Sequence, residues 1–178
     1  MIALKFSLKD HEANNELNAL SDRLSKPQEA LREIGLYLLG SIAKNFRAGG
    51  RPVRWKSSGR VLKHGGQTLV KSAGLKNSIV MRVGGKTLTI GTNKKYARIH
   101  QEGGRINKNV TVKKHWRRIS KVFGRPIKPK KIKVSTHGRK MNLTMPARPY
   151  LLIQDPSDWR VINRISEDYL LPPQKWGT

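Results

Sequence analysis

The stretch SIVMRVGGKTLTIG (Ser78–Gly91) gives the clearest β signal in the chain, because apolar and polar residues alternate on both sides of a glycine pair. Alternation with a period of two is the pattern of a half-buried strand. Gly84 and Gly85 supply the positive φ angles that a tight two-residue turn requires. The stretch therefore predicts an antiparallel hairpin with one apolar face, formed by Ile79, Met81, Val83, Leu88 and Ile90.

Helical patterns precede this hairpin. Residues His11 to Leu24 carry leucines on one side of a helix. A stronger amphipathic pattern begins after Ser25 and Pro27 and stops at Gly49-Gly50, which are typical start and stop signals. Its apolar residues recur at steps of three and four: Leu31, Ile34, Leu38, Ile42 and Phe46. Such a face must pack on an apolar surface, most simply a sheet.

The remaining segments complete the expected fold. IALKFSL (Ile2–Leu8) alternates well enough for a short strand, and Arg51 to Gly66 has the composition of a loop. Asp155-Pro156-Ser157-Asp158 is typical of a helix N-terminus, with a capping side chain and proline at the first helical position. Pro172-Pro173 would end that helix. We expect an α+β fold in one domain over residues 1–178, with helices packed on a mainly antiparallel β-sheet.

Charge is the strongest feature of the composition. The chain has 178 residues, 37 Lys and Arg, 11 Asp and Glu, and a formal charge of +26. Between Glu33 and Asp155 the only acid is Glu102, while 29 bases lie in that span. A field of this density attracts polyanions or acidic proteins. The alternative is a basic surface that is merely solvated.

The excess of positive charge is greatest in the segment from Arg105 to Lys140, which contains 14 bases and no acid. We predict strands at Val110–Val112 and Ile132–Val134 around a basic excursion, inserted before the C-terminal helix as a long arm. Trp116 and Phe123 lie among these cations, either to stack on bases or to pack beneath a cationic surface. The candidate residues for contact with DNA or a protein partner are Lys113, Lys114, Arg117, Arg118, Lys121, Arg125, Lys128, Lys130, Lys131 and Lys133.

The stretch YARIHQEGG (Tyr96–Gly104) has the residue types of an active-site loop. General acid–base catalysis needs a base held by an orienting partner, yet no second carboxylate lies between Gly35 and Gln154, and no HExxH, GxSxG or P-loop pattern occurs. With no cysteine and five scattered histidines, we expect no metal and no cofactor. Glu102 either forms an internal ion pair, with Arg148 as the preferred partner, or is an ordinary surface residue.

No membrane association is expected. The longest apolar patch, Ile34–Gly40, is far shorter than the ~20 residues that a membrane span needs. MIALKFSLKD (Met1–Asp10) lacks a signal-peptide hydrophobic region. We therefore expect a soluble protein that is made and used without export.

Several short blocks follow one another along the chain. They are SIAKNF (41–46) with the following glycines, Pro52 and Trp55, then LVKSAGLKNSI (69–79), YARIHQEGG (96–104), HWRR (115–118) with GRPI (124–127), and MPARPYL (145–151). In this order, from about Leu31 to Leu170, they resemble the phage virion morphogenesis (tail completion) family of Mu-like phages and prophages. The chain departs from the family pattern at Pro52–Trp55, where PVRW replaces the usual acidic-glycine turn.

The resemblance implies a non-enzymatic structural protein that completes the tail or the head–tail junction late in assembly, as a ring. It would be located in the virion, and in the host cytoplasm during assembly. YARIHQEGG would then be a strand that runs into a glycine turn, and PARPY a stiff approach to the last helix. The residues given structural roles are Tyr96, His100, Glu102, Gly103, Gly104, Pro146, Arg148 and Pro149.

Two rival functions remain open at the level of sequence. A free, non-specific nucleic-acid-binding protein would use the same charge without a ring. A hydrolase built on His100 is the third possibility. Under the leading hypothesis the partners are copies of this chain and tail or connector proteins, with possible contact to DNA.

Overall fold

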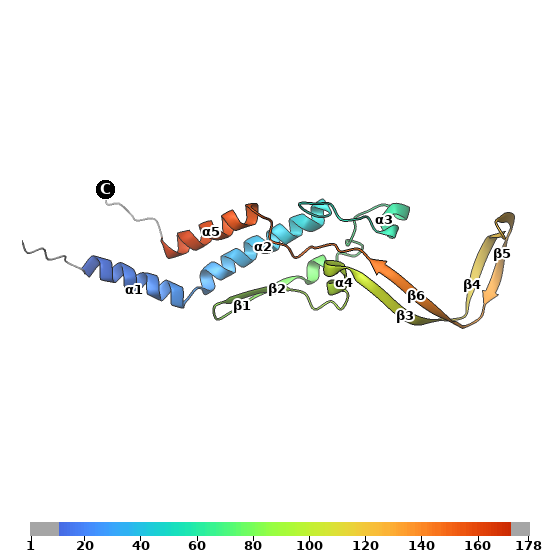
Figure 1. Cartoon of the computed structure of the whole chain (residues 1–178), viewed down its shortest axis with the longest axis horizontal. Coiled ribbons are helices and arrows are strands. Elements are labelled where there is room, and N and C mark those ends of the chain that lie inside the picture. The colour runs from blue at the N-terminus through green and yellow to red at the C-terminus, as the bar shows by residue number, and fades with distance from the viewer. Residues whose placement is uncertain (1–10, 172–178) are drawn as a thin grey trace, which may run out of the picture.

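The computed structural model describes residues 11–171 and has an α+β fold with antiparallel strands (Figure 1). The long helices and the first hairpin lie at one end, and a ribbon of strands extends away from them. The helices are α1 (His11–Ser25), α2 (Gln28–Ala48), α3 (Gly59–His64), α4 (Ala97–Glu102) and α5 (Ser157–Leu170), with a 3₁₀ turn η1 (Lys76–Ser78). The strands are β1 (Val80–Gly84), β2 (Thr87–Gly91), β3 (Gly104–Val112), β4 (His115–Val122), β5 (Arg125–Val134) and β6 (His137–Met145).

The two N-terminal helices form as expected. α2 ends at Gly49, whose φ of 71° places it in the left-handed region that glycine adopts most easily. The backbone N–H of Gly50 then closes the helix by donating to Asn45 O at 2.9 Å. The predicted apolar face is buried at Ile34, Leu38, Ile42 and Phe46, with Leu31 half-buried. It packs against β1, β2 and α5.

The predicted hairpin is also confirmed, with a small shift in its turn. Met81 pairs with Ile90 and Val83 with Leu88, as the alternation requires. Gly84 pairs with Thr87, so the turn residues are Gly85 and Lys86 rather than the two glycines. Gly85 has a φ of 57° and Lys86 has no positive φ, which fits a turn that needs glycine only at its first central position.

The strands do not join into one sheet. They form three separate two-stranded antiparallel sheets, β1–β2, β3–β6 and β4–β5. Only β1–β2 lies against α2, because the other strands are strongly charged and project from the body. The expectation of helices on a single sheet therefore holds only for the first hairpin.

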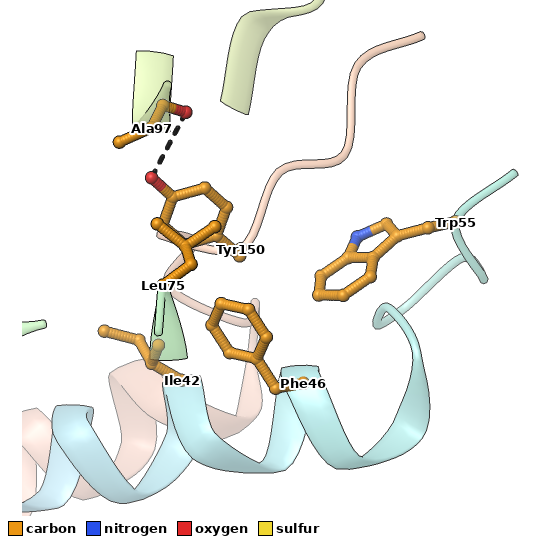
Figure 2. Close-up of a cluster of buried hydrophobic side chains, with 6 residues drawn as sticks. All are labelled: Ile42, Phe46, Trp55, Leu75, Ala97 and Tyr150. Atoms are coloured by element: carbon orange, nitrogen blue, oxygen red, sulfur yellow. Dashed lines mark hydrogen bonds between the residues drawn. The ribbon is translucent and has the colours of Figure 1, made fainter. Parts of the chain in front are cut away.

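The described residues form two buried clusters, one of Ile34, Leu38 and Ile165 and a second built around three aromatic rings (Figure 2). Phe46 contacts Trp55 edge-on, with ring centroids 5.6 Å apart, and Tyr150 at 5.4 Å. The Trp55 indole donates to Pro149 O at 3.1 Å, and the Tyr150 hydroxyl donates to Ala97 O at 3.3 Å. Both polar atoms are thereby satisfied while their rings are buried.

The start of α5 differs from its prediction. Pro156 precedes the helix rather than occupying its first position, and no side chain caps it there. Instead the buried Asp158 carboxylate accepts from Gln154 N at 2.7 Å, Ser41 Oγ at 2.9 Å and Tyr37 Oη at 3.0 Å. Asp158 thus ties α5 to α2 instead of serving only as a negative charge in the first turn.

Two other predictions need a note. Part of the segment expected to be a loop forms the short helix α3, whose N–H at Val61 is capped by Ser58 Oγ at 3.3 Å. The strand expected at residues 2–8 and the helix stop at Pro172-Pro173 lie outside the described residues. Within residues 11–171, no helix is long and apolar enough to cross a membrane.

Two glycines of α2 offer a matched test of its packing. A Cβ at Gly35 would lie 2.5 Å from Met81 Sδ and 2.9 Å from Leu88 Cδ1, whereas one at Gly40 would meet nothing within 4 Å. We expect Gly35→Ala to be less stable than Gly40→Ala by about 1–3 kcal/mol, because overpacking at Gly35 opposes the gain in helix propensity that both substitutions share. Gly40→Ala should stabilise the protein by about 1 kcal/mol through helix propensity. Urea denaturation of both variants measures this difference, and equal stabilities would contradict the packing of α2 on β1–β2.

Candidate interaction surface: the basic arm and its base

The basic arm is the segment Gly104–Met145, which leaves the body as a long antiparallel ribbon (Figure 1). β3 pairs with β6 from Gly104↔Met145 to Val112↔His137. Beyond that point β4 pairs with β5, so the predicted excursion is itself a second hairpin. The strands predicted at 110–112 and 132–134 exist but do not pair with each other. HWRR is extended in β4 and not helical.

All ten candidate contact residues lie in the outer half of the arm and are exposed. Cross-strand pairing places Arg118 with Lys131 on one face of the β4–β5 ribbon. Arg117 pairs with Ile132 and Ile119 with Lys130 on the other face. The positions are Lys113 and Lys114 before β4, Arg117, Arg118 and Lys121 on β4, and Arg125, Lys128, Lys130, Lys131 and Lys133 on β5. The cations therefore surround the outer arm and do not line a single stripe.

The inner half of the arm has one largely apolar face, formed by Ile106, Leu143, Met141 and Val110. The same face carries two exposed cations, Lys108 opposite Met141 and Arg139 opposite Val110. Asn107 pairs with Asn142 on the opposite, polar face. Leu143 is 44% exposed. A ribbon face that combines apolar side chains with cations suits contact with protein better than contact with phosphate alone.

The tip of the arm exposes an aromatic residue. Phe123 and Gly124 link β4 to β5 as a two-residue turn with φ angles of 46° and 78°, and the Phe123 side chain is 100% exposed. A bulky residue rarely adopts a positive φ, and a fully exposed phenyl ring gains nothing from burial. Trp116 is also 68% exposed, so neither aromatic packs beneath the cations as the alternative interpretation required.

We expect Phe123→Asn to stabilise the folded chain slightly, by about 0.5–1 kcal/mol, because Asn-Gly is a preferred sequence for this turn. If the phenyl ring serves only a partner, the same variant should assemble less well despite its better turn. Thermal unfolding and the yield of assembled particles measure the two effects separately. A variant that loses stability would contradict the turn geometry.

The base of the arm is built from YARIHQEGG, which is a helix and not the predicted strand: α4 covers Ala97–Glu102. Gln101 ties this helix to the segment that follows β6. Its Oε1 accepts from Tyr150 N and Leu151 N, both at 3.0 Å, and its Nε2 donates to Leu151 O at 3.0 Å. His100 O also accepts from Arg148 N at 2.8 Å. α4 thus clamps the backbone of the segment that follows β6, and Gln101 was missed among the structural candidates.

Glycines allow the two ends of the arm to pass each other closely. Gly103 has a φ of 74°, and a Cβ there would lie 2.6 Å from Ala147 N and 2.8 Å from Met145 O. Gly104 has a φ of 140°. Pro146 and Pro149 belong to the extended segment that passes this point, and Pro149 O accepts from the Trp55 indole.

Glu102 does not pair with Arg148. Its carboxylate accepts from Arg98 Nε at 2.9 Å, one helical turn earlier, with both side chains largely exposed. The alternative of a surface glutamate is the one realised, worth less than ~1 kcal/mol. Arg148 is instead 4% exposed, and its Nε donates to Lys56 O at 2.9 Å. Of the two alternatives for Glu102, the internal ion pair with Arg148 is the one that the structure contradicts.

The rings of His100 and Tyr96 meet edge-on, with centroids 6.0 Å apart. Its Nδ1 is buried and has no hydrogen-bond partner among the described residues. Burial, and then the charge of Arg148, lower the pKa of His100. His100 and Glu102 do not converge, because Glu102 points away to Arg98. In residues 11–171 no three His, Asp or Glu side chains gather as a metal site would require.

Comparison with known proteins now gives the class of protein. A sequence model of the phage virion morphogenesis family matches residues 8–170, and the chain belongs to this family. Its role is therefore in building a phage particle. The chain is 24% identical over 160 residues to the Mu-like prophage FluMu G protein 2 of Haemophilus influenzae. The aligned region covers 90% of this chain and 91% of that protein. No solved structure gives a significant match.

Proposed function

We propose that the protein completes the phage tail or the head–tail junction, and that it does so as a ring of identical subunits. The observation that carries the proposal is the basic arm, which projects from the body with one largely apolar face and ten exposed cations in its outer half. An arm of this kind is poorly explained as part of the protein's own core. Its surface suits a neighbour in a larger assembly.

Charge distribution supports a ring with defined orientation. Ten of the eleven acids lie outside residues 34–154, and the helices that carry most of them lie opposite the arm (Figure 1). Contact between two arms would bring like charges together, which is costly. The arms should therefore point to a channel that holds DNA or to acidic neighbouring proteins, while other surfaces join the subunits head to tail.

The proposal is tested by neutralising the arm in a phage or induced prophage that carries the gene. The variant R117Q/R118Q/K131Q/K133Q removes four exposed cations from the outer arm. Its matched control, R54Q/K63Q/K86Q/K94Q, removes four exposed cations elsewhere. We expect both proteins to fold, and only the arm variant to reduce particle yield. Equal yields would contradict a partner-binding role for the arm.

The exposed cations on both faces of the outer arm also favour a second candidate, a free DNA-binding protein. Its affinity for duplex DNA would fall with salt, with a slope of about −0.9 per phosphate contact on logarithmic axes. A tail-completion protein does not require tight binding to free DNA. A steep salt dependence together with nanomolar affinity, in a protein absent from particles, would favour this second candidate.

A further inference from the structure

A cavity of about 500 Å³ lies at the base of the arm, apart from the ten candidate contact residues. Its walls come from the segment before α3, the segment before η1, α4 and the end of β6. No Asp or Glu lines it, whereas four cations and a histidine do. The residues that carry the argument are Lys56, Arg60, Lys71, Tyr96, His100 and Arg148.

Arg148 is the buried cation of this cavity. It is 4% exposed and forms no ion pair with any residue in the described part of the chain. Its guanidinium has five N–H donors, of which only Nε has a protein acceptor there, Lys56 O. Burial lowers the pKa of Arg148, because a cation partly removed from water without a counter-ion is disfavoured. An anion in the cavity would remove this cost.

The other walls define which anion fits. Lys56 and Lys71 are exposed, so their charges stand at the opening. Leu69, Leu75 and Met145 give the cavity an apolar part. A glutamate side chain matches this combination, with methylenes for the apolar wall and a planar carboxylate for the arginine fork. A duplex offers its phosphates on a convex surface and reaches a buried guanidinium poorly.

We propose that this cavity binds a carboxylate from an acidic segment of a partner protein, with Arg148 at its floor and Lys56 and Lys71 at its opening. The proposal does not depend on the place of the protein in the particle. It concerns a contact that the isolated chain can make. His100, whose Nδ1 is buried, lines the same cavity, so its pKa reports whether the cavity is occupied.

The direction in which the pKa of His100 should change follows from the charge of Arg148 and the charge of the bound carboxylate. The charge of Arg148 contributes to lowering the pKa of His100. A bound carboxylate offsets that charge, so the pKa of His100 should rise when the cavity is filled. No Asp or Glu lines the cavity with His100, and Glu102, on the same helix α4, pairs with Arg98. The cations that line the cavity are Lys56, Arg60, Lys71 and Arg148, and the Tyr96 ring contacts His100.

The test uses the full chain with a tetraglutamate peptide as the probe, and inorganic phosphate and a short DNA duplex as comparisons. Calorimetry measures affinity, and the imidazole C–H resonance of His100 is followed against pH. We expect K56Q/K71Q to weaken peptide binding about tenfold, since both cations adjoin the bound charge. The control K63Q/K94Q changes the net charge equally, outside the cavity, and should alter binding less than about twofold.

The outcomes separate the possibilities. Weaker peptide binding in K56Q/K71Q alone, together with a rise in the pKa of His100 when the peptide binds the parent chain, supports the carboxylate site. Equal weakening in both double variants, or an unmoved His100, would overturn it in favour of diffuse attraction. Selective loss of phosphate or duplex binding, with the peptide unaffected, would also overturn it and assign the cavity to phosphate. None of these results depends on particle assembly, so the proposed function is tested separately.

Discussion

Phe46→Ala should destabilise the protein by about 3–5 kcal/mol, the range for removing a fully buried phenyl ring. Phe46 is 1% exposed and contacts both Trp55 and Tyr150, so its loss opens a cavity where α2 meets the segment after β6 (Figure 2). The neighbouring rings are held by hydrogen bonds to Pro149 O and Ala97 O and cannot collapse freely into the space. Urea denaturation followed by tryptophan fluorescence measures the change.

Leu36 provides the control for this prediction. It lies on the same helix but is 59% exposed. Leu36→Ala should therefore change the free energy of unfolding by less than about 0.5 kcal/mol. Similar losses in the two variants would mean that α2 does not bury the face carrying Phe46. The core also supports the base of the arm, so Phe46→Ala should reduce assembly more than Leu36→Ala.

Asp158→Ala should lower the free energy of unfolding by a similar amount, about 3–5 kcal/mol, because it leaves several hydrogen-bond donors without an acceptor. The Asp158 carboxylate is 2% exposed and accepts from Gln154 N, Ser41 Oγ and Tyr37 Oη. Arg51 donates to the same Ser41 hydroxyl at 2.9 Å, so the loss of the Asp158 carboxylate also disturbs the hydrogen bond between Arg51 and Ser41. The link between α2 and α5 would be lost.

The matched control is Asp168→Ala on the same helix. Asp168 is exposed and lies 3.8 Å from Arg164, a pair worth less than ~1 kcal/mol. Tyr37 offers a second readout. Burial, and then its hydrogen bond to Asp158, raise the pKa of Tyr37. That pKa should fall in Asp158→Ala and stay unchanged in Asp168→Ala. A stable Asp158→Ala protein with an unchanged Tyr37 titration would contradict the network.

The sequence predicted those elements whose pattern repeats. α2 and the β1–β2 hairpin each bury one face, and burial of one face imposes a period that can be read directly. The signal at YARIHQEGG is different, because α4 is too short for a helical period to emerge. The Gln101 side chain of α4 bonds to Tyr150 and Leu151, about fifty positions away. No local pattern reveals such a contact.

The contacts of the charged residues were also hard to predict, because they too depend on residues that meet only after folding. The basic arm was visible as a run of bases without acids, but its division into two hairpins depends on pairing between distant strands. The preferred partner of Glu102 was wrong because Arg98, four residues earlier on α4, reaches the carboxylate first. The cavity lined by Lys56, Lys71 and Arg148 was not predicted, since these residues meet only after folding.

The most direct measurement of the proposed role is the number and position of copies in purified particles. Quantitative mass spectrometry against a tail protein gives the copy number, and labelled antibody viewed by electron microscopy gives the position. The proposal predicts a few copies, consistent with one ring, at the end of the tail nearest the head. A protein that is absent from particles and coats DNA as a monomer would contradict it.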